Sequence, residues 1–298
     1  MYGGIEMDKK IRFTVAISAY NIENYIKRAI DSVKNQTFKN YELLIIDDCS
    51  TDNTVKIAKE TMGEDFKILS TEKNSGTAAA SRNIAINNAK GEYLLFLDGD
   101  DAIFDENTLE NIDKLIGENT FDIIYLGYES MGKDENYYRL SNQQNSTRKA
   151  RLMCDESFSV SSKCWNIKFL RDNNLLFKEG MYYEDELFSI KTNIIAKNTT
   201  FGEFPIFRYY RNRAGSVMTK PTIKKCSDWY RMLAEVIELY GITPNEDKKY
   251  FLSFLKNEND SIPLRIKVVL EALEEHENTK VLPKRRYHYE DFFENEEM

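Results

Sequence analysis

Leu-Leu-Phe-Leu-Asp-Gly-Asp-Asp, from Leu94 to Asp101, places three aspartates directly after an apolar run that predicts a buried β-strand. Carboxylates this close repel one another, and a hard divalent cation or ligand hydroxyl groups would neutralise the repulsion. Such ligands bind at strand ends of open α/β sheets. The stretch therefore predicts a metal-dependent ligand site, with a solvated acidic turn as the simpler alternative.

Strand and helix patterns alternate on both sides of this stretch, which predicts an α/β fold with parallel strands and helical crossovers. The expected strands are Phe13–Ser18, Glu42–Ile46, Phe66–Leu69, Tyr93–Leu97, Phe121–Leu126 and Phe204–Arg211. The expected helices are one capped by Asn21 that carries Tyr25–Val33, a short one over Val55–Ala58, then Thr77–Ala89, Asp105–Ile116, Lys163–Arg171 and one beginning near Glu184. The polar tract Met131–Arg151 predicts a loop.

The domain organisation follows from where this alternation stops. Residues 1–10 are expected to be an N-terminal tail, residues 11–220 one α/β domain, and residues 221–298 a helical region. Two amphipathic runs mark that last region, one with Trp229, Leu233, Val236, Ile237 and Tyr240 on one face and the other at Ile266–Leu273. Their apolar faces are expected to pack on the domain, to self-associate or to contact a partner.

Composition excludes several classes of protein. A net charge of −8 over 298 residues argues against general nucleic-acid binding. The four cysteines are widely spaced and only two histidines accompany them, which argues against a zinc site or a disulfide framework. Neither a membrane-spanning apolar run nor the apolar core of a signal peptide is visible, so a cytoplasmic location is expected.

Five motifs in a fixed order give the chain a family resemblance. They are Ala19-Tyr-Asn21, Ile46-Asp-Asp-Cys-Ser-Thr-Asp52, Asn74-Ser-Gly76 followed by Ser81-Arg-Asn83, Asp98-Gly-Asp-Asp101, and Tyr183-Glu-Asp185. In this order, up to about Ser216, the chain resembles the family 2 glycosyltransferases with the GT-A fold. It departs from that family at Ser18, where members usually carry a proline.

The resemblance implies a GT-A type, Rossmann-like mixed sheet flanked by helices, and an inverting glycosyl transfer. The donor would be a nucleotide-diphosphate sugar, with a UDP-sugar expected, and Mn²⁺ or Mg²⁺ would be the cofactor. The acceptor would be a carbohydrate, a lipid-linked glycan or a protein, in the synthesis of bacterial surface glycans or glycoconjugates. A lipid-linked acceptor would place the chain at the inner face of the membrane.

Several of these residues are candidates for donor binding, each with a plainer alternative. Asp48 could accept from a pyrimidine imide or a ribose hydroxyl group, or could cap the next helix. Asn74 and Gly76 could let the backbone approach an anion at a helix N-terminus, or form only a turn. Arg82 could reach a base or a phosphate, or could be solvated. The other expected donor contacts are Ala19, Tyr20, Asn21, Asp98, Gly99, Arg213 and Ser216; Arg213 is as well explained as part of a surface loop.

Two acidic clusters are expected to carry the chemistry. If Asp98 ends its strand, it should point towards the ribose, while Asp100 ligates the metal and Asp101 supports it. Glu184 and Asp185 would be favourable at a helix N-terminus for electrostatic reasons alone. The resemblance implies that the catalytic base lies in this pair. We expect Asp185 to be that base, with Glu184 as the next candidate.

Two other functions remain as alternatives. An aspartate-based phosphohydrolase would use Asp98 as nucleophile and Asp100 as acid or base, although such an enzyme needs this pair after the first strand of its domain. A non-catalytic nucleotide-sugar binding subunit would use the helical region to recruit a partner.

Overall fold

The computed structural model describes residues 10–63, 67–132, 136–139 and 159–211, together with residues 224, 228, 231, 232, 235, 238, 239, 241 and 243 of the C-terminal region. Its strands are β1 (Phe13–Ala19), β2 (Tyr41–Asp47), β3 (Lys67–Ser70), β4 (Tyr93–Asp98), β5 (Ala102–Ile103), β6 (Ile123–Met131), β7 (Asn136–Arg139), β8 (Lys163–Asn166) and β9 (Thr199–Tyr210). Its helices are α1 (Ile26–Lys34), α2 (Thr54–Met62), α3 (Ala79–Asn88), α4 (Thr108–Ile116), α6 (Ile167–Asp172) and α7 (Glu184–Ile195), with a 3₁₀ turn, η2, at Val160–Ser162.

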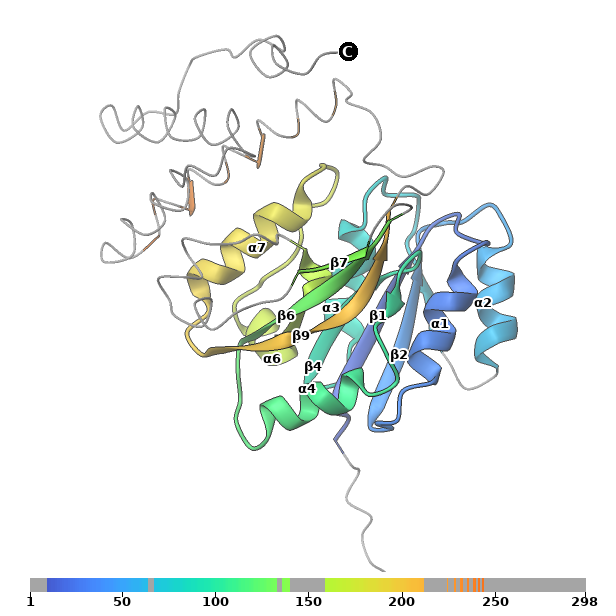
Figure 1. Cartoon of the computed structure of the whole chain (residues 1–298). Helices are drawn as coiled ribbons and strands as arrows, with labels where there is room; N and C mark the ends of the chain where they lie inside the picture. Colours follow the sequence, from blue (N-terminus) through green and yellow to red (C-terminus); the bar gives the residue numbers. More distant parts are fainter. Residues whose placement is uncertain are drawn as a thin grey trace, which may run out of the picture.

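The described strands form one mixed sheet in the order β3-β2-β1-β4-β8-β6-β9-β5, and β7 pairs with β6. Strands β1 to β4 are parallel, as the alternation predicts. Strand β8 runs antiparallel to both β4 and β6, and thereby joins the parallel part to the β6–β9 pair. The expected mixed α/β fold is therefore confirmed (Figure 1).

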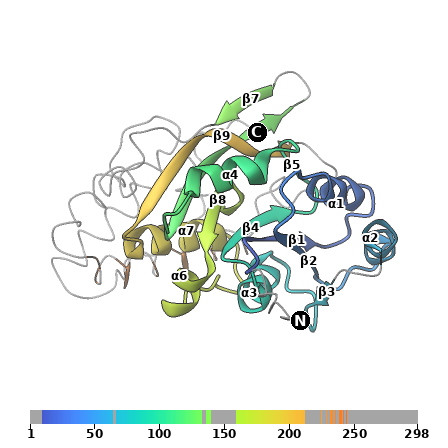
Figure 2. The same cartoon turned by 90° about the horizontal axis from the view of Figure 1, so that it is seen from below.

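Helices cover both faces of the sheet, and each face has its own core. Viewed from below, α1, α2 and α4 lie on one side of the sheet and α3 and α6 on the other (Figure 2). Alternate side chains of β1 divide accordingly. Val15 and Ile17 pack with Ile30 and Ile112, whereas Ala16 belongs to the core that contains Ile86 of α3.

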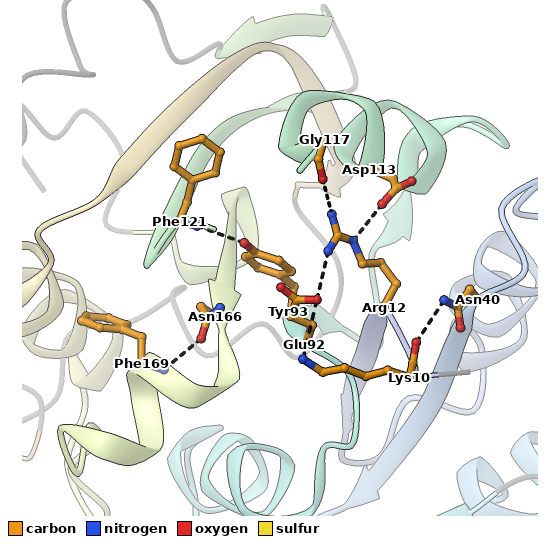
Figure 3. Close-up of polar contacts among 10 residues, drawn as sticks. All are labelled: Lys10, Arg12, Asn40, Glu92, Tyr93, Asp113, Gly117, Phe121, Asn166 and Phe169. Atoms are coloured by element: carbon orange, nitrogen blue, oxygen red, sulfur yellow. Dashed lines mark hydrogen bonds and ion pairs between the residues drawn. The ribbon is translucent and has the colours of Figure 1, made fainter. Parts of the chain in front are cut away.

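Polar contacts close the edge of the sheet at the start of β1 and β4. None of the residues predicted for the site takes part in these contacts. Arg12 bonds Glu92 at 2.9 Å and Asp113 at 2.8 Å, and also donates to the carbonyl oxygen of Gly117 (Figure 3). The hydroxyl group of Tyr93 accepts from the backbone N–H of Phe121. These contacts tie α4 to the start of β4. The opposite strand ends carry the predicted acidic residues.

Two predictions of local structure are wrong. Lys163 begins strand β8 and not a helix; Lys163, Cys164 and Trp165 are almost fully buried between β4 and β6, where consecutive side chains face two covered sides. Helix α6 begins only at Ile167, and Asn166 caps it by accepting from the N–H of Phe169. The tract Met131–Arg151 is not a loop throughout, since β6 extends to Met131 and residues 136–139 form β7.

The helix expected after Asn21 begins later than its capping residue. Helix α1 starts at Ile26, and the side-chain oxygen of Asn21 accepts from the N–H of Thr51 at 2.8 Å instead of capping it. This contact joins the loops that follow β1 and β2. The other expected elements are present with ends shifted by a few residues, except that β9 begins at Thr199 and the short β5 was not expected.

Part of the C-terminal prediction can be followed. Residues 224, 228, 231, 232, 235, 238, 239 and 241 are helical, and Met232 and Leu239 are buried. Trp229, Leu233, Val236, Ile237, Tyr240 and Ile266–Leu273 lie outside the described residues, and the domain limits stay a prediction. Among the described helices, none combines the length and the apolar character that crossing a membrane requires.

Candidate active site

Arg82 of α3 connects the two predicted acidic clusters. Its Nη2 atom lies 3.0 Å from Oδ1 of Asp98 at the end of β4, and its Nη1 atom lies 3.3 Å from Oε1 of Glu184 at the start of α7. The side chain is only 7% exposed, and its guanidinium group lies over the ring of Phe177. Arg82 is therefore not a solvated arginine. Its planar fork holds together carboxylates that are 86 residues apart.

The charges of this bridge shift the pKa values of its members. Burial lowers the pKa of Arg82, but Asp98 and Glu184 more than offset that effect, so its pKa lies above the usual value. Burial raises the pKa of Glu184 to about 7; Arg82 opposes this rise, and the neighbouring Asp185 adds to it. Glu184 is therefore able to hold a proton near neutral pH.

The first acidic cluster lies at the strand end that the sequence predicts. Asp98 is the last residue of β4, and its side chain is 39% exposed. Asp100 is partly buried, and Asp101 is almost fully buried, with Oδ1 accepting from the N–H of Tyr210. Burial raises the pKa of Asp101 well above its usual value, and the charges of Asp100 and Asp98 raise it further. The three carboxyl groups therefore lie close enough for their charges to interact.

Helix α1 and strand β9 surround this cluster. Arg28 donates to the backbone carbonyl oxygen of Asp100, and its guanidinium group lies 3.6 Å from the ring centre of Tyr210. Tyr209 is partly exposed on β9, and the charges of Asp101 and Asp100 add to burial in raising its pKa. The end of β9 therefore forms one wall beside the aspartates.

Asp48 orders a loop and does not cap a helix. Its carboxylate accepts from the backbone N–H and the hydroxyl group of Ser75, both at 3.0 Å, and from the hydroxyl group of Thr71 at 2.7 Å. The side chain of Asn74 donates to the carbonyl oxygen of Asp48, and Gly76 adopts a φ of +78°. Helix α2 is preceded instead by Asp52, whose carboxylate accepts from the N–H of Thr54. The capping alternative for Asp48 is therefore wrong.

The remaining residues around the end of β1 have mixed surroundings. Ala19 is buried at the end of that strand, whereas Tyr20 is 46% exposed. A Cβ atom on Gly99 would lie 2.3 Å from Ile22 and 2.9 Å from the carbonyl oxygen of Ser18. Close packing against β1 therefore requires a glycine at position 99, whatever its part in donor binding.

Asp185 lies one residue beyond the buried Glu184, on the first turn of α7. It is partly buried, and its Oδ1 atom accepts from the N–H of Glu186 at 2.9 Å. The residue before this helix, Tyr183, has a left-handed φ of 65°. Arg213 and Ser216, which were predicted to contact the donor, lie outside the described residues.

The carboxylate oxygens of the first cluster are ligands of the kind that Mg²⁺ and Mn²⁺ prefer. Within the described ranges, no group of three or more histidine, cysteine, aspartate or glutamate side chains is arranged to enclose a metal ion.

Comparison with known proteins decides the family. The model of the family "Glycosyl transferase family 2" matches residues 14–184, which is more than half of the chain; the range includes the Asp98 cluster and ends at Glu184, the first residue of the second acidic cluster. The chain belongs to glycosyl transferase family 2.

The most similar relatives include two bacterial glycosyltransferases. The poly(ribitol-phosphate) β-N-acetylglucosaminyltransferase TarS of Staphylococcus aureus is 27% identical over 231 residues, which are 75% of this chain and 39% of TarS. TarP of the same species, which carries the same enzyme name, is 34% identical over 63% of this chain and 59% of its own length. The chain thus spans less than two thirds of either relative.

The fold agrees with a solved member of the family. The crystal structure of a TarS fragment in complex with UDP has a TM-score of 0.68, with 23% identity over 84% of this chain and 72% of that chain. At this level of identity the likeness concerns the fold, and it confirms the GT-A type expected from the sequence.

Arg28, Thr71 and Ser75 contact the predicted site residues, but sequence reasoning did not assign them a role. Ser75 lies inside the Asn74-Ser-Gly76 motif and could have been considered from that position. Arg28 lies on a helix with no local pattern that distinguishes it from a surface arginine. Its partner, the carbonyl oxygen of Asp100, is 72 residues away in the chain.

The raised pKa of Glu184 makes a prediction about stability and pH. Between about pH 4.5 and about pH 7, folded Glu184 holds a proton that the unfolded chain has released, so this residue's contribution to stability is lost as the pH rises. Glu184→Gln should remove that contribution. As the pH rises across this range, the free energy of unfolding of the variant should fall by roughly 1–3 kcal/mol less than the free energy of unfolding of the wild type. Urea unfolding at several pH values measures the difference.

The exposed variant Glu235→Gln is a suitable control for this measurement, because it also removes one carboxylate. It should follow the wild-type pH dependence. If the free energy of unfolding changes equally with pH in the wild type and in Glu184→Gln, Glu184 has an ordinary pKa in the folded chain.

Proposed function

We propose that this chain transfers a sugar from a nucleoside diphosphate donor, with UDP as the nucleotide, to an acceptor hydroxyl group, with inversion at the anomeric carbon. The observation that carries the proposal is the bridge by Arg82, which brings the Asp98 cluster and the Glu184–Asp185 pair to one place. One cluster can serve the donor and its leaving group, and the other can serve the acceptor. Family membership supports the same division of roles.

The first cluster is suited to hold a divalent cation together with the diphosphate. Asp100 would ligate Mn²⁺ or Mg²⁺, and Asp101, fixed by the N–H of Tyr210, would support that ligand. When bound, the cation stabilises the negative charge that develops on the departing diphosphate. The three aspartates gathered at the end of β4 support such a cation. So does the Mn²⁺ in the structure of the mannosyltransferase PcManGT from Pyrobaculum calidifontis, which shares the fold with a TM-score of 0.57 at 15% identity over 91% of this chain and 76% of its own.

The loops after β1, β2 and β3 would bind the nucleoside. Asp48 orders the segment from Thr71 to Ser75, so it would act on the nucleotide both directly and through that loop. Asn74 and Gly76 lie in the same loop, which Asn74 joins to the end of β2 through the carbonyl oxygen of Asp48. Asn21 joins the loop after β1 to the loop after β2 through Thr51. UDP is favoured as the nucleotide because TarS, which shares this fold, is known in complex with UDP.

Asp185 would act as the general base. It would take the proton from the acceptor hydroxyl group as the oxygen attacks the anomeric carbon on the face opposite the diphosphate. Glu184 is occupied by Arg82 and has a raised pKa, which makes it a weaker candidate for a free carboxylate. Arg82 would hold Glu184 and Asp98 in fixed orientations.

The acceptor class follows only from the relatives. TarS and TarP act on poly(ribitol-phosphate), so a surface glycan or glycoconjugate is the acceptor that we propose. An acceptor on a lipid carrier would bring the chain to the inner face of the membrane. A phosphohydrolase is less well supported, because Asp98 ends β4, the fourth strand along the chain, and not the first strand of the domain.

The metal assignment predicts how UDP binds. UDP should bind at least tenfold more tightly with Mn²⁺ than with a chelator, because Asp100 and the diphosphate share the cation; one ligand contact of about 1.4 kcal/mol corresponds to that factor. Asp100→Ala should bind UDP equally with and without Mn²⁺. Titration calorimetry measures both affinities.

Asp105→Ala is a matched control for this titration, since Asp105 lies at the start of α4, where it bonds Thr108. It should retain the metal dependence. Equal UDP affinity of the wild type with Mn²⁺ and with chelator would contradict a metal-bridged donor.

A further inference from the structure

The C-terminal region contacts the turn that precedes the proposed base. Asp228 has a side chain that is 4% exposed, and its Oδ2 atom accepts from the backbone N–H of Tyr182 at 3.0 Å. Arg231 bonds the other carboxylate oxygen at 3.1 Å, and Lys224 bonds Oδ2. Both cations also donate to the carbonyl oxygen of Gly180. One helical segment therefore contacts the turn at two backbone groups.

This turn determines where α7 begins. Gly180 has a φ of +75° and Tyr183 a φ of 65°, while Met181 between them is fully buried. A left-handed tyrosine is unfavourable by itself and persists where its surroundings hold it. Glu184 and Asp185 follow at once, so a change in this turn would displace both carboxylates.

Among the partners of the buried Asp228 carboxylate, the backbone N–H of Tyr182 depends on it most. Burial raises the pKa of Asp228, but the bonds from Lys224, Tyr182 and Arg231 more than offset this, so its pKa lies below the usual value. Lys224 and Arg231 are about half exposed, so water could replace the carboxylate for them. The backbone N–H of Tyr182 would lose this acceptor.

We propose that Asp228, held by Lys224 and Arg231, is a positioning residue that sets the orientation of Asp185 through the Gly180–Tyr183 turn. The proposal rests on the proposed function, since it assigns Asp185 to the acceptor side of the reaction. The segment lies beyond residues 14–184, the range that the family model matches. In this proposal the C-terminal region contributes a residue that positions the active site, in addition to packing on the α/β domain.

Three variants of the full chain test this role. Asp228→Ala removes the acceptor for Tyr182, and Asp228→Asn keeps an acceptor oxygen but loses the charge. Glu235→Gln is the control, because Glu235 lies on the same segment and pairs at 2.8 Å with Lys178, which lies two residues before the turn and not within it. Hydrogen exchange of the peptide spanning residues 180–187 is measured first, followed by UDP affinity and by UDP release from UDP-GlcNAc with a glycan acceptor.

Asp228→Ala should exchange faster in this peptide, and turnover should fall roughly 10- to 100-fold, the scale expected for a misplaced reacting group, while UDP affinity stays within about twofold. Asp228→Asn should show a smaller loss, and Glu235→Gln should match the wild type. If Asp228→Ala does not fold, Asp228→Asn decides. A purely structural role would lower the melting temperature without a separate loss of turnover.

Unchanged hydrogen exchange of residues 180–187 in both Asp228 variants would overturn the proposal, whichever sugar donor the chain uses. Faster exchange together with wild-type turnover would also overturn it. Asp185→Asn, measured beside them, separates this failure from that of the proposed function. Loss of turnover in Asp185→Asn but not in Asp228→Ala would support Asp185 as the base and contradict only the positioning role of Asp228. Wild-type turnover in Asp185→Asn would remove the proposed base itself.

Discussion

Asp185→Asn should lower turnover by roughly 10²- to 10⁴-fold and leave donor affinity nearly unchanged. A general base acts on the acceptor hydroxyl group in the transition state, and its removal does not alter the contacts of the bound nucleotide. The amide retains the shape of the carboxylate and an oxygen that can accept from the N–H of Glu186. The first turn of α7 should therefore stay folded. Turnover is measured as UDP release from a productive donor and acceptor, and affinity by calorimetry with UDP.

The plainer explanation of Asp185, favourable charge at a helix N-terminus, makes a different prediction. Asparagine is almost as good as aspartate at such a position, so activity and stability would both be retained. Glu186→Gln is a matched control, since Glu186 is an acidic residue of the same first turn. Near wild-type turnover in Asp185→Asn would remove Asp185 as the base and leave Glu184 as the next candidate.

Above about pH 7, where Glu184 is ionised, Arg82→Met should destabilise the chain by about 3 kcal/mol, at the lower end of the cost of breaking a buried ion pair. Glu184 would keep its burial and lose its cation, whereas Asp98 is 39% exposed and could be solvated. The free energy of unfolding in urea measures this loss. Turnover should also fall, because the two acidic clusters would no longer share a bridge.

The double variant Arg82→Met with Glu184→Gln distinguishes the ion pair from simple packing. Removal of both partners leaves no buried, uncompensated charge, so the double variant should be more stable than Arg82→Met alone. If the effects of the two substitutions simply add, the bridge contributes no coupling energy and is not what joins the clusters.

Local patterns were sufficient for the parallel part of the fold. Apolar runs end at Asp47 and Asp98, and both residues do end strands, β2 and β4. The pattern failed at Lys163, because the short strand Lys163–Asn166 is buried along its whole length, shows no alternation of polar and apolar residues, and runs directly into helix α6. The true boundary was marked by Asn166, a helix-capping residue.

The candidate site could be predicted only as separate pieces. The aspartates at the end of β4 and the acidic pair at the start of α7 were visible as motifs, and their order is typical of the family. The contacts between them were not visible, since Arg82 meets Glu184 102 residues away and Asp228 meets Tyr182 46 residues away. Such pairings depend on tertiary packing, and a single sequence contains no local pattern that indicates them.

Phosphorus NMR of the products formed from a UDP-sugar, with Mn²⁺ and a glycan acceptor, tests the central claim most directly. Glycosyl transfer breaks the bond between the anomeric carbon and the diphosphate, so intact UDP should be the only nucleotide product, and its release should require the acceptor. UMP together with a sugar phosphate, formed without any acceptor, would mean that the aspartate cluster cleaves the diphosphate and would contradict glycosyl transfer.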